Sequence, residues 1–251
     1  MPLVSVITAA YAPKAGYLPD TAASVAAQQL PPGWELEWLV QEDGDVPSLL
    51  DVVAGVPSAR YEANDALLGI AATRNLALSR ARGELVRVLD HDDVLLPGAL
   101  GLGLAPFVAA PGTWWAFTAA DELDPVGRRR AQPAPPVAGA VPRGVLGLIT
   151  DASGRWSVYC AGLTARTEAV RALGGWLASP RSEDVGLLTA LAELGDGYIE
   201  EQVGWLYRRH PDQTHLEGGW QLREVQATRL VRQRLAAVRA TGLRFDVVYA
   251  G

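Results

Sequence analysis

The sequence predicts an α/β protein built on a mostly parallel, right-handed wound sheet. Apolar runs of strand length alternate with helix-like segments through the first hundred residues, and the loops between them are short. Three predicted strands have polar residues at their carboxyl ends: Tyr11 in the loop after the first, Glu42-Asp43 after the second and Asp90-His91-Asp92 after the fourth. Because ligands bind outside the carboxyl ends of the strands in such sheets, these three ends define the expected site.

The first half of the chain supplies the regular elements. Strands are expected at 3–8, 35–40, 59–62 and 85–89, and helices at 17–29, 47–53 and 69–82. Pro31-Pro32-Gly33 ends the first helix and Gly83 ends the third. Residues 1–110 therefore form the regular half of the chain.

The second half is less regular. Residues 94–120 carry no ionisable side chain, but their prolines and glycines argue against one spanning helix and favour a helix after Pro97 and a strand at 114–118. Residues 124–143 are rich in Pro, Ala, Gly and Arg, which favours a solvated loop over a substrate lid. Beyond them we expect a strand at 157–163, helices at 167–173 and from Glu183 to Gly195, a strand at 203–207 and a helix at 219–241.

Composition bounds the function. A chain of 251 residues with 49% hydrophobic residues fills one sizeable core, and it shows no repeats, so a single domain is expected. A net charge of −6 argues against nucleic acid or an anionic membrane as the main partner. The single cysteine, Cys160, fits a reducing cytoplasm, and no membrane span is expected. Neither a G-x-G-x-x-G nor a P-loop motif occurs, so a dehydrogenase or P-loop enzyme is not expected.

The most informative stretch is GELVRVLDHDDVLLP, from Gly83 to Pro97. A buried strand breaks without a linker into Asp90-His91-Asp92-Asp93, and strand alternation places Asp90 and Asp92 on one side. Clustered carboxylates repel one another unless a cation lies among them. Mg²⁺ or Mn²⁺, which combines one or two protein carboxylates with water and substrate phosphates, is the obvious candidate. The alternative is a solvated acidic loop.

Other polar groups carry two interpretations each. Asp43 forms either a plain Asx turn or a contact to a nucleotide base. Glu183-Asp184 either favours the start of a helix electrostatically or supplies a general base. Arg74 is either a surface arginine or a nucleotide contact, and His210 is either a metal ligand or a loop hydrogen-bond partner, with His91 and His215 less favoured as ligands.

The order of these signals resembles the large family of inverting nucleotide-sugar glycosyltransferases with the GT-A fold (family 2-like). The matching residues run from about 3 to 215: Val4 to Thr8 with Tyr11, Glu42-Asp43-Gly44, Gly69 with Ala72 to Asn75, Gly83-Glu84, Asp90 to Asp93, Gly174-Gly175-Trp176 and Glu183-Asp184. The resemblance implies one GT-A domain with a Rossmann-like central sheet and flanking helices. It divides this domain into a nucleotide-binding half at 1–110, an irregular acceptor-side half at 111–215 and a C-terminal helical extension at 216–251. Gln41-Glu42 departs from the family's aspartate, which weakens the expected base contact.

The resemblance also implies roles. Asp43 would hold the base beside Tyr11, and Arg74, Asp90 and His91 would complete the nucleotide site. Asp92 and Asp90, with His210 as a late ligand, would hold Mn²⁺ or Mg²⁺ against the diphosphate. Asp184 would be the base, with Glu183 the less favoured choice.

The implied reaction moves one sugar from a UDP-, dTDP- or GDP-linked donor to an acceptor hydroxyl with inversion. Transfer is expected to be non-processive, because the Gln-x-x-Arg-Trp motif of processive members is absent. Two alternatives stay open at this point. One is a metal-dependent nucleotidyl or phosphoryl transferase that uses the same acidic cluster. The other is a non-catalytic module on the same fold that binds nucleotide sugars or glycans.

Overall fold

The computed structural model of the protein describes residues 1–146, 159–216, 219 and 221–246. The strands of this part of the chain are β1 Leu3–Ala10, β2 Glu35–Glu42, β3 Ala59–Ala63, β4 Leu85–Val88, β5 Val94–Leu95, β6 Trp115–Leu123, β7 Arg129–Arg130, β8 Gly139–Val141, β9 Leu163–Arg166 and β10 Gly197–Arg208. The α-helices are α1 Leu18–Ala26, α2 Leu50–Val53, α3 Ile70–Ser79, α4 Ala99–Ala109, α6 Thr167–Ala172, α7 Glu183–Leu194 and α8 Glu224–Thr241. Short 3₁₀ turns are η1 Ala12–Tyr17, η2 Cys160–Gly162, η3 Thr214–Leu216 and η4 Gln221–Arg223.

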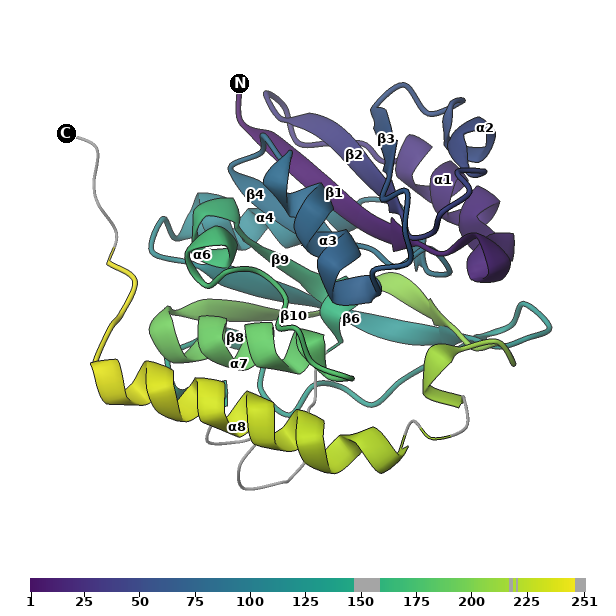
Figure 1. The fold of residues 1–251 in the computed structure, drawn as a ribbon. Helices are drawn as coiled ribbons and strands as arrows, with labels where there is room; N and C mark the ends of the chain where they lie inside the picture. The colour runs from purple at the N-terminus through teal and green to yellow at the C-terminus, as the bar shows by residue number, and fades with distance from the viewer. Residues whose placement is uncertain (147–158, 217–218, 220, 247–251) are drawn as a thin grey trace.

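One sheet runs through the molecule in the order β3-β2-β1-β4-β9-β6-β10-β5, with β7 beside β6 and β8 beside β10 (Figure 1). Strands β3, β2, β1 and β4 are parallel neighbours, and β10 is parallel to β6. Strand β9 is antiparallel to both β4 and β6 and therefore joins the two parallel sets. The mostly parallel α/β sheet expected from the sequence is confirmed. Strands from before and after residue 110 belong to the same sheet.

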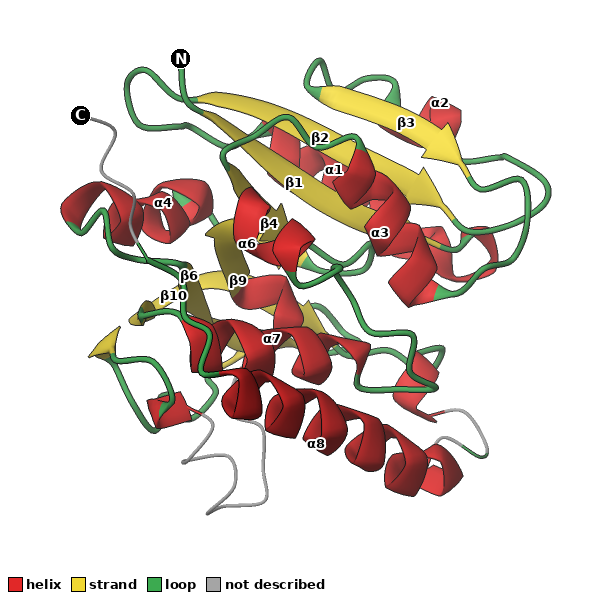
Figure 2. Cartoon of the chain, turned by 60° about the vertical axis from the view of Figure 1, so that its left-hand side comes forward, coloured by secondary structure: helices red, strands yellow, loops and turns green. Residues whose placement is uncertain are grey.

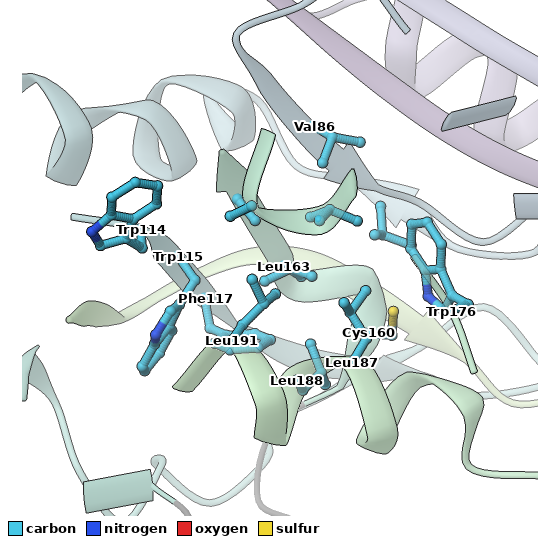
Figure 3. Close-up of a cluster of buried hydrophobic side chains, with 14 of the residues drawn as sticks. Val86, Trp114, Trp115, Phe117, Cys160, Leu163, Trp176, Leu187, Leu188 and Leu191 are labelled. Atoms are coloured by element: carbon cyan, nitrogen blue, oxygen red, sulfur yellow. The ribbon is translucent and has the colours of Figure 1, made fainter. Parts of the chain in front are cut away.

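Helices cover both faces of the sheet (Figures 1 and 2). Alternation along β1 directs Val6 into the cluster that contains α1, α2 and part of α4, and Ile7 into the cluster that contains α3, α6 and α7. Figure 3 shows the second cluster, in which leucines of α7 pack against Trp115 and Phe117 of β6. Helix α8 lies along α7 and forms the outermost layer on that side (Figure 2).

Several elements differ from the sequence predictions. A strand was expected at 157–163, but β9 begins only at Leu163, and η2 precedes it; residues 157 and 158 lie outside the described residues. A Cβ atom on Gly162 would lie 2.9 Å from the carbonyl oxygen of Thr118, so the chain turns there at a close backbone contact. Helix α8 begins at Glu224 rather than 219, because Gly219 adopts a left-handed φ of 83° and η4 follows it.

The segment expected as a loop, 124–143, is anchored at both ends. Strand β7 pairs with β6, where Arg129 donates to Asp121 at 2.6 Å, and β8 pairs with β10. A role as a lid for this segment stays a prediction. None of the helices in the described ranges combines the length and apolarity needed to cross a bilayer.

A buried carboxylate, Glu37 on β2, connects β1, β3 and the segment before β4 through hydrogen bonds. It accepts hydrogen bonds from Ser5 Oγ at 2.6 Å, from a guanidinium nitrogen of Arg60 at 2.8 Å and from the backbone N–H of Arg82 at 2.7 Å. Burial works to raise the pKa of Glu37, but these hydrogen bonds outweigh it and lower that pKa to about 2. The folded state therefore favours the ionised form of Glu37.

Glu37→Gln is expected to lower the free energy of unfolding at pH 7 by about 2 kcal/mol, because several charge-assisted hydrogen bonds become neutral or are lost. The lowered pKa means that the stabilisation is complete above the unfolded pKa of 4.5 and disappears as the pH falls towards 2. Urea unfolding at pH 7, 4 and 3 should therefore show the wild type and the variant converging. Glu35→Gln, on the exposed start of the same strand, is the control and should change little; a constant difference between wild type and Glu37→Gln at all three pH values would contradict this account.

Candidate active site

The polar residues predicted at the strand ends lie together at the carboxyl end of the parallel strands. Strands β2, β1 and β4 are adjacent and parallel, so the residues that follow them emerge side by side. Asp90 to Asp93 follow β4, Tyr11 follows β1, and Asp43 follows β2. Tyr11 and Asp90 are half-buried and Asp43 is buried. The carboxyl ends of these strands therefore bring together three predicted groups: the acidic turn, Tyr11 and Asp43.

Arg74 on α3 lies at the centre of the site. Its side chain is only 3% exposed, and its two terminal nitrogens donate to different carboxylates: one to Asp90 Oδ1 at 2.5 Å and the other to Glu183 Oε1 at 2.9 Å. Burial works to lower the pKa of Arg74, but the charges of Asp90 and Glu183 outweigh it and raise that pKa above its usual range. The interaction joins two acidic segments that lie more than ninety residues apart in the chain.

Trp176, from the Gly-Gly-Trp segment, closes the far side of Arg74. The guanidinium carbon lies 5.8 Å from the centre of the Trp176 ring, and the Trp176 backbone N–H donates to Asn75 Oδ1 at 2.9 Å. Gly175 is required for this approach, because a Cβ atom there would lie 2.0 Å from Asn75 Oδ1, and its φ of 68° is left-handed. The two predicted neighbours therefore have complementary roles. Arg74 binds Asp90 and Glu183, and Asn75 holds the loop that carries Trp176.

Glu183 and Asp184 begin α7, after Ser182 in a left-handed conformation with φ of 57°. Glu183 is buried against Arg74, whereas Asp184 is half-buried and accepts the Val185 N–H at 2.8 Å. Burial first, and then repulsion from Asp184, raise the pKa of Glu183 to about 7. Burial also raises the pKa of Asp184, and Arg74 partly offsets it. The two carboxylates therefore share one environment in which full ionisation is costly.

A second cluster forms around Asp92, at the end of β10. The Nε2 atom of His210 lies 2.9 Å from Asp92 Oδ2, and the opposite ring nitrogen, Nδ1, is buried without a hydrogen-bond partner among the described residues. Arg208 donates from Nε to the Asp92 carbonyl oxygen at 2.8 Å and from its backbone N–H to Asp93 Oδ1 at 2.9 Å. The end of β10 therefore fixes both the backbone and the side chain of the acidic turn.

Asp93 differs from its neighbours because it is 1% exposed. Burial, followed by repulsion from Asp92 and Asp90, raises its pKa well above the usual range. Asp93 therefore packs inside the turn, whereas Asp90 and Asp92 are half-buried at its surface. The sequence alone does not separate Asp93 from the other two, since all three are aspartates in one run.

Two oxygens of the acidic turn stay available for a divalent cation. In the part of the chain that the structure describes, nothing donates to Asp90 Oδ2 or Asp92 Oδ1. Among the same residues, no group of three or more His, Cys, Asp or Glu side chains is placed to hold a metal ion. Two carboxylates are enough for Mg²⁺ or Mn²⁺ when water and substrate phosphates supply the other ligands. The residues therefore fit a metal held jointly with a substrate. His210 is hydrogen-bonded to Asp92 at 2.9 Å, and its role as a late metal ligand stays a prediction.

Asp43 organises the start of α3. Its Oδ1 accepts the Leu68 N–H at 2.7 Å and the Asn64 amide at 3.0 Å, and its Oδ2 accepts the Gly69 N–H at 2.9 Å. These contacts hold the loop from which α3, and hence Arg74, begins. The predicted contact between Asp43 and a base stays a prediction. Glu42, which stands where the resemblance leads one to expect aspartate, accepts from Tyr61 Oη at 2.5 Å and is likewise used within the chain.

His91 connects the acidic turn to the segment that follows β1. Its Nδ1 lies 3.2 Å from the carbonyl oxygen of Ala9, and its Nε2 lies 3.3 Å from that of Lys14. Both ring nitrogens therefore face backbone of the Tyr11 region, and any contribution of His91 to nucleotide binding acts through that segment. The side chain of His215 lies outside the described residues.

Sequence reasoning missed two residues that shape the site. Arg208 carries no signal except its place after a predicted strand. Cys160 was used only to infer the redox environment, yet it is buried beside Trp176 in the core beneath the site (Figure 3). Burial chiefly raises the pKa of the Cys160 thiol, with Arg74 and Asp184 among the charges that act on it. Only the fold brings these residues to the acids.

Comparison with known proteins identifies the family. The family described as "Glycosyl transferase family 2" matches residues 5–136, more than half of the chain. The chain belongs to glycosyl transferase family 2. This match confirms the resemblance predicted from the sequence and places a glycosyltransferase domain in the half that carries Asp43, Arg74 and the acidic turn.

Solved structures confirm the GT-A fold. S. aureus TarS, residues 1–349 in complex with UDP-GlcNAc, superposes with a TM-score of 0.70 at 18% identity over 95% of this chain and 69% of that one. The same TarS fragment with UDP gives a TM-score of 0.66 over 95% and 68%. A curated relative, the uncharacterized protein y4gI of Sinorhizobium fredii, is 32% identical over 132 residues, which are 51% of this chain and 14% of that protein. This chain therefore spans a small part of that relative's length.

Arg74→Met is expected to destabilise the folded protein by about 3 kcal/mol or more, because it leaves the buried Glu183 charge unpaired. Glu183→Gln in the same chain removes that charge, so the double variant Arg74→Met/Glu183→Gln should recover part of the loss. Urea unfolding at pH 8, where Glu183 is mostly ionised, measures both. A double variant as unstable as the sum of the two single variants would show that the pair is not coupled.

Proposed function

We propose that this family 2 domain transfers one sugar from a nucleoside-diphosphate sugar to an acceptor hydroxyl, with inversion at the anomeric carbon and with Mn²⁺ or Mg²⁺ as cofactor. One observation carries the proposal: Arg74 brings the Asp90–Asp93 turn and the Glu183–Asp184 pair into one site. The first group suits a diphosphate with its cation, and the second suits an acceptor hydroxyl. Separate surfaces for the two groups would not support transfer.

The donor is proposed to lie along the carboxyl ends of β2, β1 and β4. The fold shared with TarS, whose structure contains UDP-GlcNAc, supports a UDP-linked donor, and dTDP- and GDP-linked sugars belong to the same chemical class. Tyr11 and Asp43 are proposed to flank the base, while Asp90 and Asp92 face the diphosphate. A metal bound there would offset the negative charge that develops on the leaving nucleoside diphosphate.

Asp184 is the proposed general base. It is less buried than Glu183, which is held by Arg74 and is therefore less free to approach a substrate. In the transfer step the acceptor oxygen forms a bond to the anomeric carbon from the face opposite the diphosphate, and the bond to the diphosphate oxygen breaks. The acceptor proton passes to the Asp184 carboxylate. Glu183 holds Arg74 in place and adds negative charge that raises the basicity of its neighbour.

Thermal unfolding with nucleoside diphosphates and their sugars, with and without Mn²⁺, tests donor binding. UDP or a related diphosphate should raise the melting temperature only when the metal is present, since a ligand of the native state stabilises it. Asp92→Ala should abolish that shift. Asp184→Ala should keep it and lose at least a hundredfold in transfer rate if Asp184 is the base. A preference for triphosphates, or full activity in Asp184→Ala, would contradict the proposal.

The pH dependence of transfer gives a second test. Because the base must be ionised and burial raises the pKa of Asp184, kcat/KM should increase with pH on an acidic limb that lies above the usual range of an aspartate. Glu183→Gln keeps a hydrogen-bond acceptor for Arg74 but removes the like charge, so the acidic limb should move to lower pH. An unchanged limb in Glu183→Gln would show that the pair does not control the reaction.

A further inference from the structure

Three aromatic rings, those of Tyr159, Trp205 and Tyr207, form a cluster that we call the aromatic platform. The rings of Tyr159 and Tyr207 are stacked, with centroids 5.4 Å apart and planes inclined by 10°. Trp205 stands edge-on to both, with centroids 6.3 Å away and interplanar angles of 83° and 81°. Trp205 and Tyr207 come from β10, and Tyr159 directly precedes η2. Segments distant in the chain therefore build one ordered stack.

The platform is graded from core to solvent. Trp205 is buried, Tyr207 is half-buried, and Tyr159 is 53% exposed. Gln213 donates to the Tyr207 hydroxyl and to the Arg208 carbonyl oxygen, at 2.9 Å each, and so fixes the middle ring. A single exposed tyrosine needs no explanation. A tyrosine supported from beneath by a fixed ring, however, presents a preformed flat surface.

The platform adjoins both acidic groups of the candidate active site. Trp205 pairs with Leu95 of β5, directly after the acidic turn, and Arg208, which follows Tyr207, hydrogen-bonds with Asp92 and Asp93. Burial first, and then the nearby Asp93 and Asp92, raise the pKa of Tyr207 to about 12.

On the other side, Tyr159 is bonded in the chain to Cys160. Cys160 begins η2, which contacts both β4, the strand before the acidic turn, and α7, the helix that begins with Glu183 and Asp184. The exposed ring of the platform therefore borders a segment that contacts the helix of the proposed base, outside the strand ends assigned to the donor.

We propose that the exposed ring of Tyr159 is the stacking surface for a pyranose ring of the acceptor, so that the acceptor is a glycan or glycoside. The C–H face of a sugar packs well on an aromatic ring, and its hydroxyls remain free to reach a carboxylate. A fixed ring orients the sugar at little entropic cost, which is what a hydroxyl aimed at Asp184 requires. This inference rests on the proposed function and assigns the acceptor class for the same site.

Methyl glycosides are suitable probes, because each carries one pyranose ring. We would use methyl β-D-glucopyranoside, methyl β-D-galactopyranoside and methyl α-D-mannopyranoside, with glycerol as an acyclic hydroxyl donor. Saturation-transfer NMR should show contact from the ring C–H groups of at least one glycoside to the wild-type protein. This contact should be lost in Tyr159→Ala and kept in Tyr159→Phe, which retains the ring.

In transfer assays, Tyr159→Ala should raise KM for the bound glycoside about fivefold to tenfold and leave kcat and the KM for the donor within about twofold. Tyr159→Phe and Leu222→Ala, the latter an exposed apolar position on η4, should behave as the wild type. The effect on glycerol should be small, since glycerol offers no ring face.

The proposal is overturned if no methyl glycoside contacts the wild type, or if Tyr159→Ala binds glycosides and transfers to them as the wild type does. Equal losses for glycerol and glycosides would also overturn it. Stabilisation by a nucleoside diphosphate with Mn²⁺ separates these outcomes from failure of the proposed function. If that stabilisation persists while the Tyr159 variants have no effect, only the acceptor assignment fails.

Discussion

The site depends on one buried positive side chain, the guanidinium group of Arg74. Arg74 is removed from water and is stable there only because carboxylates from two distant segments face it, and those carboxylates are in turn tolerable beside each other only because Arg74 lies between them. Neither the acidic turn nor the start of α7 holds this arrangement alone. The Asp43 contacts to the loop before α3 and the Gly175 contact to Asn75 have the same effect, since both fix where Arg74 stands.

The acidic turn is held from its other side by the chain itself. Arg208 fixes the backbone at Asp92, His91 faces backbone oxygens near Tyr11, and the Oγ1 of Thr21 lies 2.8 Å from the carbonyl oxygen of Asp93. These contacts use main-chain oxygens, so they leave the carboxylate oxygens of Asp90 and Asp92 that would face a cation unoccupied by these three groups. Preorganisation of this kind lets charged groups face a ligand without rearranging first.

The parallel half of the fold was predictable because burial on both faces produces continuous apolar strands, and glycine or proline marks the ends of the helices. The short strands β5, β7 and β8 were not predictable, since two or three residues carry no periodicity. Asp90, Asp92, Arg74 and Glu183 could be singled out as a set, because their order follows a family pattern. Their pairing could not, because nothing local states that Arg74 faces Glu183, that Asp93 is buried, or that His210 turns its Nε2 to Asp92. Those facts come from tertiary packing.

Cys160 provides a way to follow local opening of the structure, although the proposed transfer reaction does not use it. It is the single thiol in the sequence, and it is buried in the hydrophobic cluster that contains Trp176 and the leucines of α7. A thiol enclosed in this way reacts with a modifying reagent only when the surrounding structure opens. The rate at which a reagent modifies Cys160 therefore reports how often this region opens locally, and it can be measured in the natural sequence without an engineered cysteine.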